Sequence, residues 1–301
     1  MTNASAPASR LLSSIPASPG HVAAVQRLLG HIDDMPPGAT GALHFGEHGV
    51  ILLQARKICW AVARTMRIRL TDILRNQTTP PVPREHVEQI YRRCKENGTP
   101  IGEALVASGL ASEAGLRAAL FKHNGEAIVA LAGSSALPDE FVAHSKTGYD
   151  PKYSFAACEV LAMLGSLDDL ARGAAAQLEL ASMLVPDSVG AAFVRGAAAS
   201  GAMVIAVSSG CDFPIRDLLG VCNWASGLFD LANTVDSEIF CARASWRGNA
   251  GLVTWRDRDV GYIGLCSSRA AAARLVSRMS ERSGRTSGVL PRGSSGAGEP
   301  A

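Results

Sequence analysis

The chain has 301 residues, of which 47% are hydrophobic and 5% aromatic, so it is long enough for two domains of ordinary size with real cores. Its formal net charge of +2 argues against a polyanionic partner, because nucleic-acid binders usually carry a dense basic face. The seven cysteines are scattered and never in CxxC spacing. We therefore expect them to be small buried hydrophobic side chains in a reducing cytoplasm, not metal or redox groups.

The two ends of the chain have compositions typical of disordered tails. Residues 1–20 are rich in Ala, Ser and Pro, and they contain no apolar run long enough for a signal peptide or a membrane helix. Residues 283–301 are rich in Gly and Ser. We therefore expect a cytoplasmic protein that has no contact with a membrane.

The first ordered segment predicts a small hairpin domain. Residues 21–29 have a short helical pattern, which a Pro- and Gly-rich loop follows. The β-suited runs 41–45 and 49–55 are separated by glycines, which indicates a hairpin. A second turn at Arg56 leads into a third β-suited run over 58–63.

His44 and His48 lie four residues apart and raise the question of a metal site. A zinc-binding pair at this spacing works because a helix places both imidazoles on one face. Here Gly46 and Gly49 favour a turn, and Glu47 stands in the wrong place for the general base of an HExxH motif. We therefore interpret both histidines as surface residues of a hairpin and expect no metal.

Helical patterns follow the hairpin. Residues 70–77 and 84–97 each have apolar positions at helical spacing. The apolar stripe of the second is formed by Val87, Ile90, Tyr91 and Cys94. Residues 101–131 then predict two helices around Gly109, the second capped by Ser112.

The helical pair over 101–131 leaves a second hypothesis open, that of a transcription-related DNA-binding regulator. The second helix offers mainly Arg117, Lys122 and His123, with no basic cluster. Two helices bent around a glycine are also a common way of packing. DNA binding is therefore the alternative and not the principal hypothesis.

The second half has a regular pattern that begins after a turn-rich linker over 137–153. Ser166 is expected to cap a helix, and Pro214 to open the long one. The predicted order is α-β-β-α-β-β-β-α, that is, an antiparallel sheet flanked by helices in an α+β protein. Strands are expected over 191–195, 202–208, 238–246, 251–255 and 260–266. The long helix is expected over 215–235, between the second and third of these strands, and a last helix over 269–282.

The first half resembles the PATAN-type domain of bacterial signalling proteins. The matching pattern consists of Gly41, Leu43 and Phe45, and then of Lys57, Ile58, Cys59, Trp60 and Ala61. Arg56 and Lys57 occupy a turn where that family usually has glycine. The segment 101–120 is similar to the helical pair found with such domains and in the N-terminal regions of secretion ATPases. The resemblance assigns 21–136 to a PATAN-like domain.

The second half resembles the Roadblock fold of dynein-type light chains and bacterial GTPase regulators, a profilin-like architecture. The match is the order of elements from Ser166 to Arg282, and it assigns 154–282 to a Roadblock-like domain. In that family the long central helix and the following strand dimerise, and the dimer binds small Ras-like GTPases. The resemblance therefore implies a homodimer whose partner is such a GTPase or another regulator.

The long helix carries two apolar stripes, of which its own sheet needs only one. An uncovered second stripe would be costly in water, at about 25 cal/mol per Å² of apolar surface. The alternative is that it packs under helices of the same chain. The expected dimer or partner surface consists of Val221, Trp224, Leu228 and Leu231 with Phe240 and Ala242 of the next strand.

No catalytic constellation emerges from the sequence. Neither GxGxxG nor GxxxxGK[ST] occurs. Ser208 to Gly210 lack the spacing of a nucleophile elbow, and no histidine follows His144 that could act as a base for them or for Cys211. We therefore expect a non-catalytic bacterial signalling or scaffold protein without cofactors.

Overall fold

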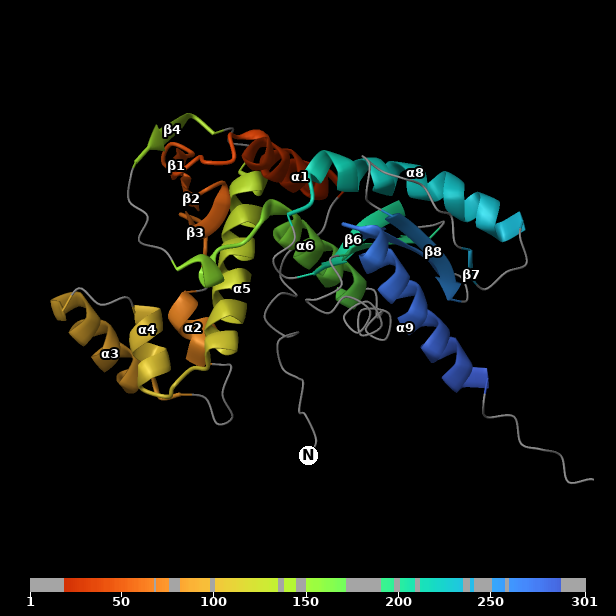
Figure 1. Ribbon diagram of the computed structural model, residues 1–301. Helices are drawn as coiled ribbons and strands as arrows, with labels where there is room; N and C mark the ends of the chain where they lie inside the picture. Colours follow the sequence, from red (N-terminus) through yellow and green to blue (C-terminus); the bar gives the residue numbers. More distant parts are fainter. Residues whose placement is uncertain are drawn as a thin grey trace, which may run out of the picture.

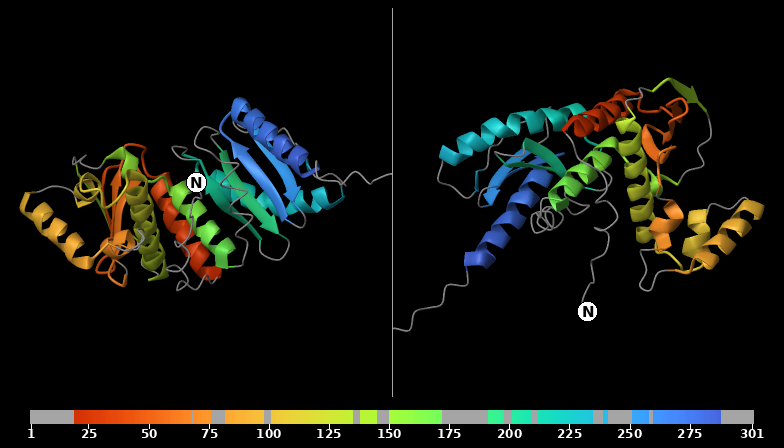
Figure 2. Two further views of the ribbon diagram at one scale, coloured as in Figure 1. Left: turned by 90° about the horizontal axis from the view of Figure 1, so that it is seen from below. Right: turned by 180° about the vertical axis from the view of Figure 1, so that it is seen from behind.

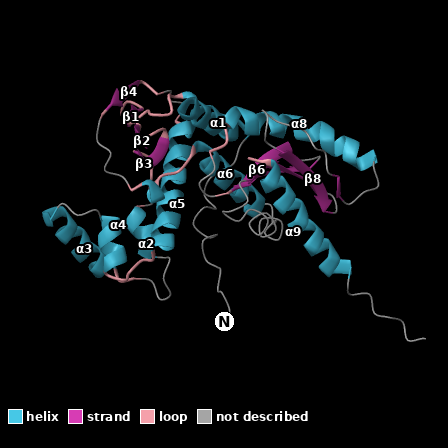
Figure 3. Ribbon diagram, in the orientation of Figure 1, coloured by secondary structure: helices cyan, strands magenta, loops and turns pink. Residues whose placement is uncertain are grey.

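The computed structural model describes residues 19–67, 69–75, 82–97, 101–134, 138–144, 150–171, 191–197, 201–208, 212–234, 239–240, 251–257 and 260–287. Within these ranges the chain is an α+β protein with two antiparallel sheets (Figure 1). Helices α1, α5 and α6 lie between the two sheets (Figure 3). Among the described helices, none has both the length and the apolar character needed to cross a membrane.

The first sheet is built on the predicted hairpin. Its strands are β1 (Gly41–His44), β2 (Gly49–Gln54), β3 (Lys57–Ala63) and β4 (Glu140–Ala143), in the order β3-β2-β1-β4. The hairpin prediction is confirmed, with Leu43 opposite Ile51 in the register. Helix α1 (Pro19–Asp34) is longer than the predicted 21–29 and contributes Leu29 and Ile32 to the core beneath this sheet.

The linker predicted over 137–153 was wrong in part, because β4 lies inside it. This strand pairs antiparallel with β1, so that Phe141 lies opposite Leu43. A short 3-10 helix, Pro151–Tyr153, then leads to Phe155, whose backbone exchanges two hydrogen bonds with Ile58 at the edge of β3. A four-residue strand among turn residues gives too short a pattern to stand out in the sequence.

Four helices follow the hairpin: α2 (Leu70–Arg75), α3 (Arg84–Asn97), α4 (Ile101–Ala107) and α5 (Glu113–Gly133). Ser112 caps α5 as predicted, because its hydroxyl accepts a hydrogen bond from the Gly115 N–H at 3.0 Å. The predicted stripe of α3 needs one correction. Val87 and Cys94 are buried, but Tyr91 is 54% exposed.

The second sheet has five antiparallel strands in the order β6-β5-β9-β8-β7. Helices α8 and α9 lie on opposite sides of it (Figure 2). The elements of this half are α6 (Ala157–Ala171), β5 (Ala191–Ala197), β6 (Gly201–Val207), α8 (Ile215–Thr234), β7 (Ile239–Phe240), β8 (Gly251–Asp257), β9 (Val260–Cys266) and α9 (Arg269–Ser287).

Ser166 was expected to begin a helix, and this prediction was wrong. Helix α6 runs without a break from Ala157 to Ala171, so Ser166 lies in its interior. The N-terminus of α6 is satisfied by Glu159, whose carboxylate accepts a hydrogen bond from the Ala156 N–H at 3.0 Å. Residues 172–190, which include most of the helix predicted to begin at Ser166, lie outside the described residues.

One hydrophobic core extends through both halves of the molecule. Its largest cluster joins Phe45 of the first sheet, Ile128 of α5, Val160 of α6, Leu218 of α8 and Ile263 of β9. The boundary predicted at residue 154 therefore does not separate two independent cores.

Candidate interaction surface

Helix α8 is the element that carries the predicted partner surface. It begins at Ile215, directly after Pro214, whose carbonyl accepts hydrogen bonds from the Asp217 and Leu218 N–H groups. The helix contacts β5, β6, α1 and α6. Its buried face consists of Ile215, Leu218, Val221 and Cys222.

Trp224 lies outside that buried face. Its side chain is 47% exposed, and it is one of four large hydrophobic side chains that are exposed in the described part of the chain. Tryptophan carries a large apolar area, so leaving half of it in water is unfavourable at about 25 cal/mol per Å². Exposed aromatic residues of this kind are enriched at protein–protein interfaces.

Val221 was expected beside Trp224 on the partner surface, and this prediction was wrong. The side chain of Val221 is 0% exposed and belongs to the shared core. Residues three apart on a helix differ by only about 60° in direction, so Val221 lies close to Leu218. Because α8 contacts both the sheet and other helices, its buried face is wider than a single apolar stripe.

The structure describes the remaining predicted surface residues only in part. Leu228 and Leu231 lie within α8, but their side chains are outside the described part of the chain. Phe240 lies in β7, at the edge of the sheet, and only its backbone is described. Ala242 is outside the described residues. Of the predicted surface residues whose side chains are described, Val221 is buried and Trp224 is exposed.

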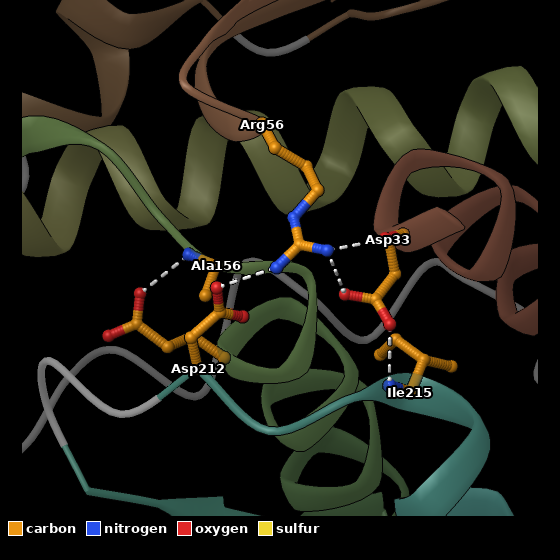
Figure 4. Close-up of polar contacts among 6 residues, drawn as sticks. Asp33, Arg56, Ala156, Asp212 and Ile215 are labelled. Atoms are coloured by element: carbon orange, nitrogen blue, oxygen red, sulfur yellow. Dashed lines mark hydrogen bonds and ion pairs between the residues drawn. The ribbon is translucent and has the colours of Figure 1, made fainter. Parts of the chain in front are cut away.

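A polar cluster fixes the start of α8 to the first half of the molecule (Figure 4). The guanidinium of Arg56 donates to the main-chain carbonyl of Asp33 at 2.6 Å and to the Asp212 carboxylate at 2.9 Å. It also lies 3.7 Å from the carboxylate of Asp33. The other oxygen of that carboxylate accepts a hydrogen bond from the Ile215 N–H at 2.9 Å. We call Arg56, Asp33 and Asp212 the clasp.

The clasp explains the unusual residue in the β2–β3 turn. Ala55 and Arg56 have φ values of 49° and 65°, in the left-handed region that favours glycine. The sequence has arginine at this position, and its side chain reaches α1 and the segment before α8. The contacts of Arg56 hold a backbone conformation that is unfavourable for the residue itself.

Asp33 is the most buried carboxylate of the clasp, at 8% exposure. Burial raises its pKa above the ordinary value, whereas the Ile215 N–H and Arg56 act in the opposite direction. Asp212 adds a further negative charge that raises the same pKa. Arg56 therefore compensates two carboxylates that would otherwise repel each other.

A second ion pair joins α5 to the N-terminus of α6. Arg117 lies 2.9 Å from the carboxylate of Glu159, and its guanidinium stacks over the ring of Phe155 at 4.5 Å. It also donates to the main-chain carbonyl of Lys152. Burial raises the pKa of Glu159, and Arg117 opposes this shift. Both halves are thus joined at the N-termini of two helices.

Helix α5 is buried along much of its surface, which bears on the DNA-binding alternative. A recognition helix must present one face to the groove. Asn124 of α5 instead pairs with the edge of β3, accepting from the Ala61 N–H at 2.9 Å and donating to the Cys59 carbonyl at 3.5 Å. His123 is buried against Trp60, with 4.5 Å between ring centroids. These contacts do not favour a groove-reading role.

The described cysteines are buried thiols, as predicted: Cys59, Cys94, Cys158, Cys222 and Cys266. Burial raises the pKa to about 11 for Cys59 and about 12 for Cys158 and Cys222, which keeps these thiols protonated and unreactive. His44 ends β1, and His48 lies just before β2. Over the described ranges, no three His, Cys, Asp or Glu side chains are grouped to hold a metal ion.

Comparison of the chain with protein-family models, with curated proteins and with solved structures finds no match. A functional assignment therefore depends on the residues of α8 and on the arrangement of elements around it.

Proposed function

We propose that the chain is a non-catalytic signalling or scaffold protein that forms a homodimer through α8 and the edge strand that follows it in the chain, β7. The observation that carries the proposal is Trp224, a tryptophan about half exposed (47%) on a helix whose opposite face is buried between Ile215 and Cys222. A second copy of the same surface would bury this side chain with twofold symmetry.

The proposal extends to a partner, a small Ras-like GTPase or a related regulator. Support comes from the order of elements between α6 and α9, with a long helix between the second and third strands and β7 at the sheet edge. This order is the one on which the resemblance to the Roadblock fold is based. The first half, with its PATAN-like hairpin, would then receive a signal or determine where in the cell the dimer is located.

The GTPase proposal is tested by titrating the purified full chain into a fluorescently labelled Ras-like GTPase from the same organism, loaded with GDP or with a GTP analogue. We expect saturable binding that depends on the nucleotide. Trp224→Glu, which leaves the opposite face of α8 unchanged, should abolish binding if the dimer is the binding unit. Absence of binding in both nucleotide states would contradict the proposed partner and would leave the dimer to be judged on its own measurement.

A further inference from the structure

Three segments that are far apart in the sequence meet at the clasp. Arg56 comes from the β2–β3 turn, Asp33 from the last turn of α1, and Asp212 from the segment before α8 (Figure 4). Nearby, the backbone of Ile58 in β3 exchanges two hydrogen bonds with Phe155, which lies just before α6. The first turn of α8 is thus held by residues of the other half.

The residue directly before α8 cannot cap the helix with its side chain. The residue before Ile215 is Pro214, which has no side-chain acceptor for the free N–H groups of the first turn. Asp33 supplies that acceptor from a position 182 residues away in the chain. A carboxylate at this end of a helix also interacts favourably with the helix dipole. The orientation of the first turn of α8 therefore depends on the place of Asp33.

Loss of the side-chain contacts of Arg56 is expected to change the backbone conformation of the β2–β3 turn. Ala55 and Arg56 both have left-handed backbone conformations, which are unfavourable for non-glycine residues and are held here by the hairpin pairing together with the contacts of Arg56. A packed helix moves as a rigid rod, with a rise of about 1.5 Å per residue. A change of tilt at Ile215 therefore displaces Trp224, which lies nine residues further along the same helix.

We infer that the clasp is a coupling device between the hairpin of the first sheet and the partner surface on α8. An event that displaces the β2–β3 turn, such as a ligand binding to the hairpin, weakens association at Trp224. Association at Trp224 in turn tightens the hairpin, because coupling between two sites is reciprocal. This inference rests on the proposed function for the role of Trp224. The link between the β2–β3 turn and the first turns of α8 can be measured whether or not the chain forms a dimer.

The test uses hydrogen exchange of the full chain, with mass spectrometry, on wild type and on Arg56→Ala. The control is Arg64→Ala, because Arg64 belongs to the same hairpin region and its side chain pairs with the exposed Glu47. We expect Arg56→Ala to speed exchange in the first turns of α8 by about tenfold, the scale of one lost charge-assisted contact. Arg64→Ala should leave α8 unchanged.

The reciprocal arm uses the same measurement on Trp224→Glu. If the chain is a dimer, breaking it should speed exchange at residues 54–58, and Arg56→Ala should weaken self-association by at least about fivefold. Faster exchange in Arg56→Ala that is confined to the turn, with α8 unchanged, would overturn the coupling. A monomeric wild type would instead overturn the dimer, and the exchange of α8 in Arg56→Ala would still decide the coupling. If Arg56→Ala does not fold, the same exchange measurement is made on Asp212→Asn, which removes a charged partner of Arg56 at a more exposed position.

Discussion

Asp33, in the last turn of α1, accepts a hydrogen bond from the backbone N–H of Ile215, the first residue of α8. The two residues belong to different halves of the chain, and the contact is buried. It replaces the cap that Pro214 cannot provide, so the C-terminal end of one helix stabilises the N-terminal end of another.

Asp33→Ala should lower the free energy of unfolding by about 1–2 kcal/mol, because α8 loses its cap and Arg56 loses one of its two carboxylates. Asp33→Asn should have a smaller effect, since the amide oxygen can still accept from Ile215. The neighbouring Asp34 is exposed, so Asp34→Ala serves as the control. Urea unfolding of the three variants checks this prediction, and equal losses for Asp33→Ala and Asp34→Ala would contradict it.

Asn124 closes the edge of β3, because its amide pairs with both the N–H of Ala61 and the carbonyl of Cys59. Asn124→Ala leaves these two buried groups without partners and should cost about 2–4 kcal/mol. Asn97→Ala, at the exposed end of α3, should change stability by less than about 0.5 kcal/mol. The idea fails if both variants unfold at the same urea concentration as the wild type.

We expect His123 to make the stability of the protein depend on pH. Burial lowers its pKa below the ordinary 6.5, although the backbone of Ala61 opposes the shift. Below pH 6.5 the unfolded chain binds a proton that the folded chain does not bind, so the contribution of His123 is fully present above 6.5 and is lost as the pH falls toward the lower folded value.

The pH prediction is checked with His123→Phe, which keeps a ring against Trp60 but cannot titrate. Unfolding free energies of both proteins are measured at about pH 7.5 and about pH 5.5. The wild type should lose more stability between these two conditions than the variant does. The other histidines are present in both proteins, so equal losses would mean that His123 does not titrate differently on folding.

The parts of the fold that could be predicted are those that local patterns determine. Gly46 and Gly49 indicate the β1–β2 hairpin, and Ser112 caps α5 through a residue three positions away. Ser166 has the same local signature as Ser112 but lies inside α6, because packing against β6 and α1 favours a continuous helix. Local capping signals are weaker than tertiary burial where the two compete.

The clasp and the Asn124 contact could not be predicted, because their partners lie far apart in the sequence. Two signals were nevertheless present. Arg56 stands at a turn position where glycine was expected, and Pro214 precedes a long helix without offering a capping side chain. Each indicates a missing partner without identifying it. On α8, the spacing assigned Val221 to the partner surface, whereas the structure buries it in the core.

The central claim is that Trp224 on α8 is the contact of a homodimer. Light scattering with sedimentation velocity on the full chain tests it most directly, comparing wild type, Trp224→Glu and Tyr91→Glu. Tyr91 is a matched control, since it is also exposed on a helix but lies far from α8, on α3 (Figure 1). We expect a dimer for the wild type and Tyr91→Glu, and a folded monomer for Trp224→Glu. A monomeric wild type, or a dimer that survives Trp224→Glu, would contradict the claim.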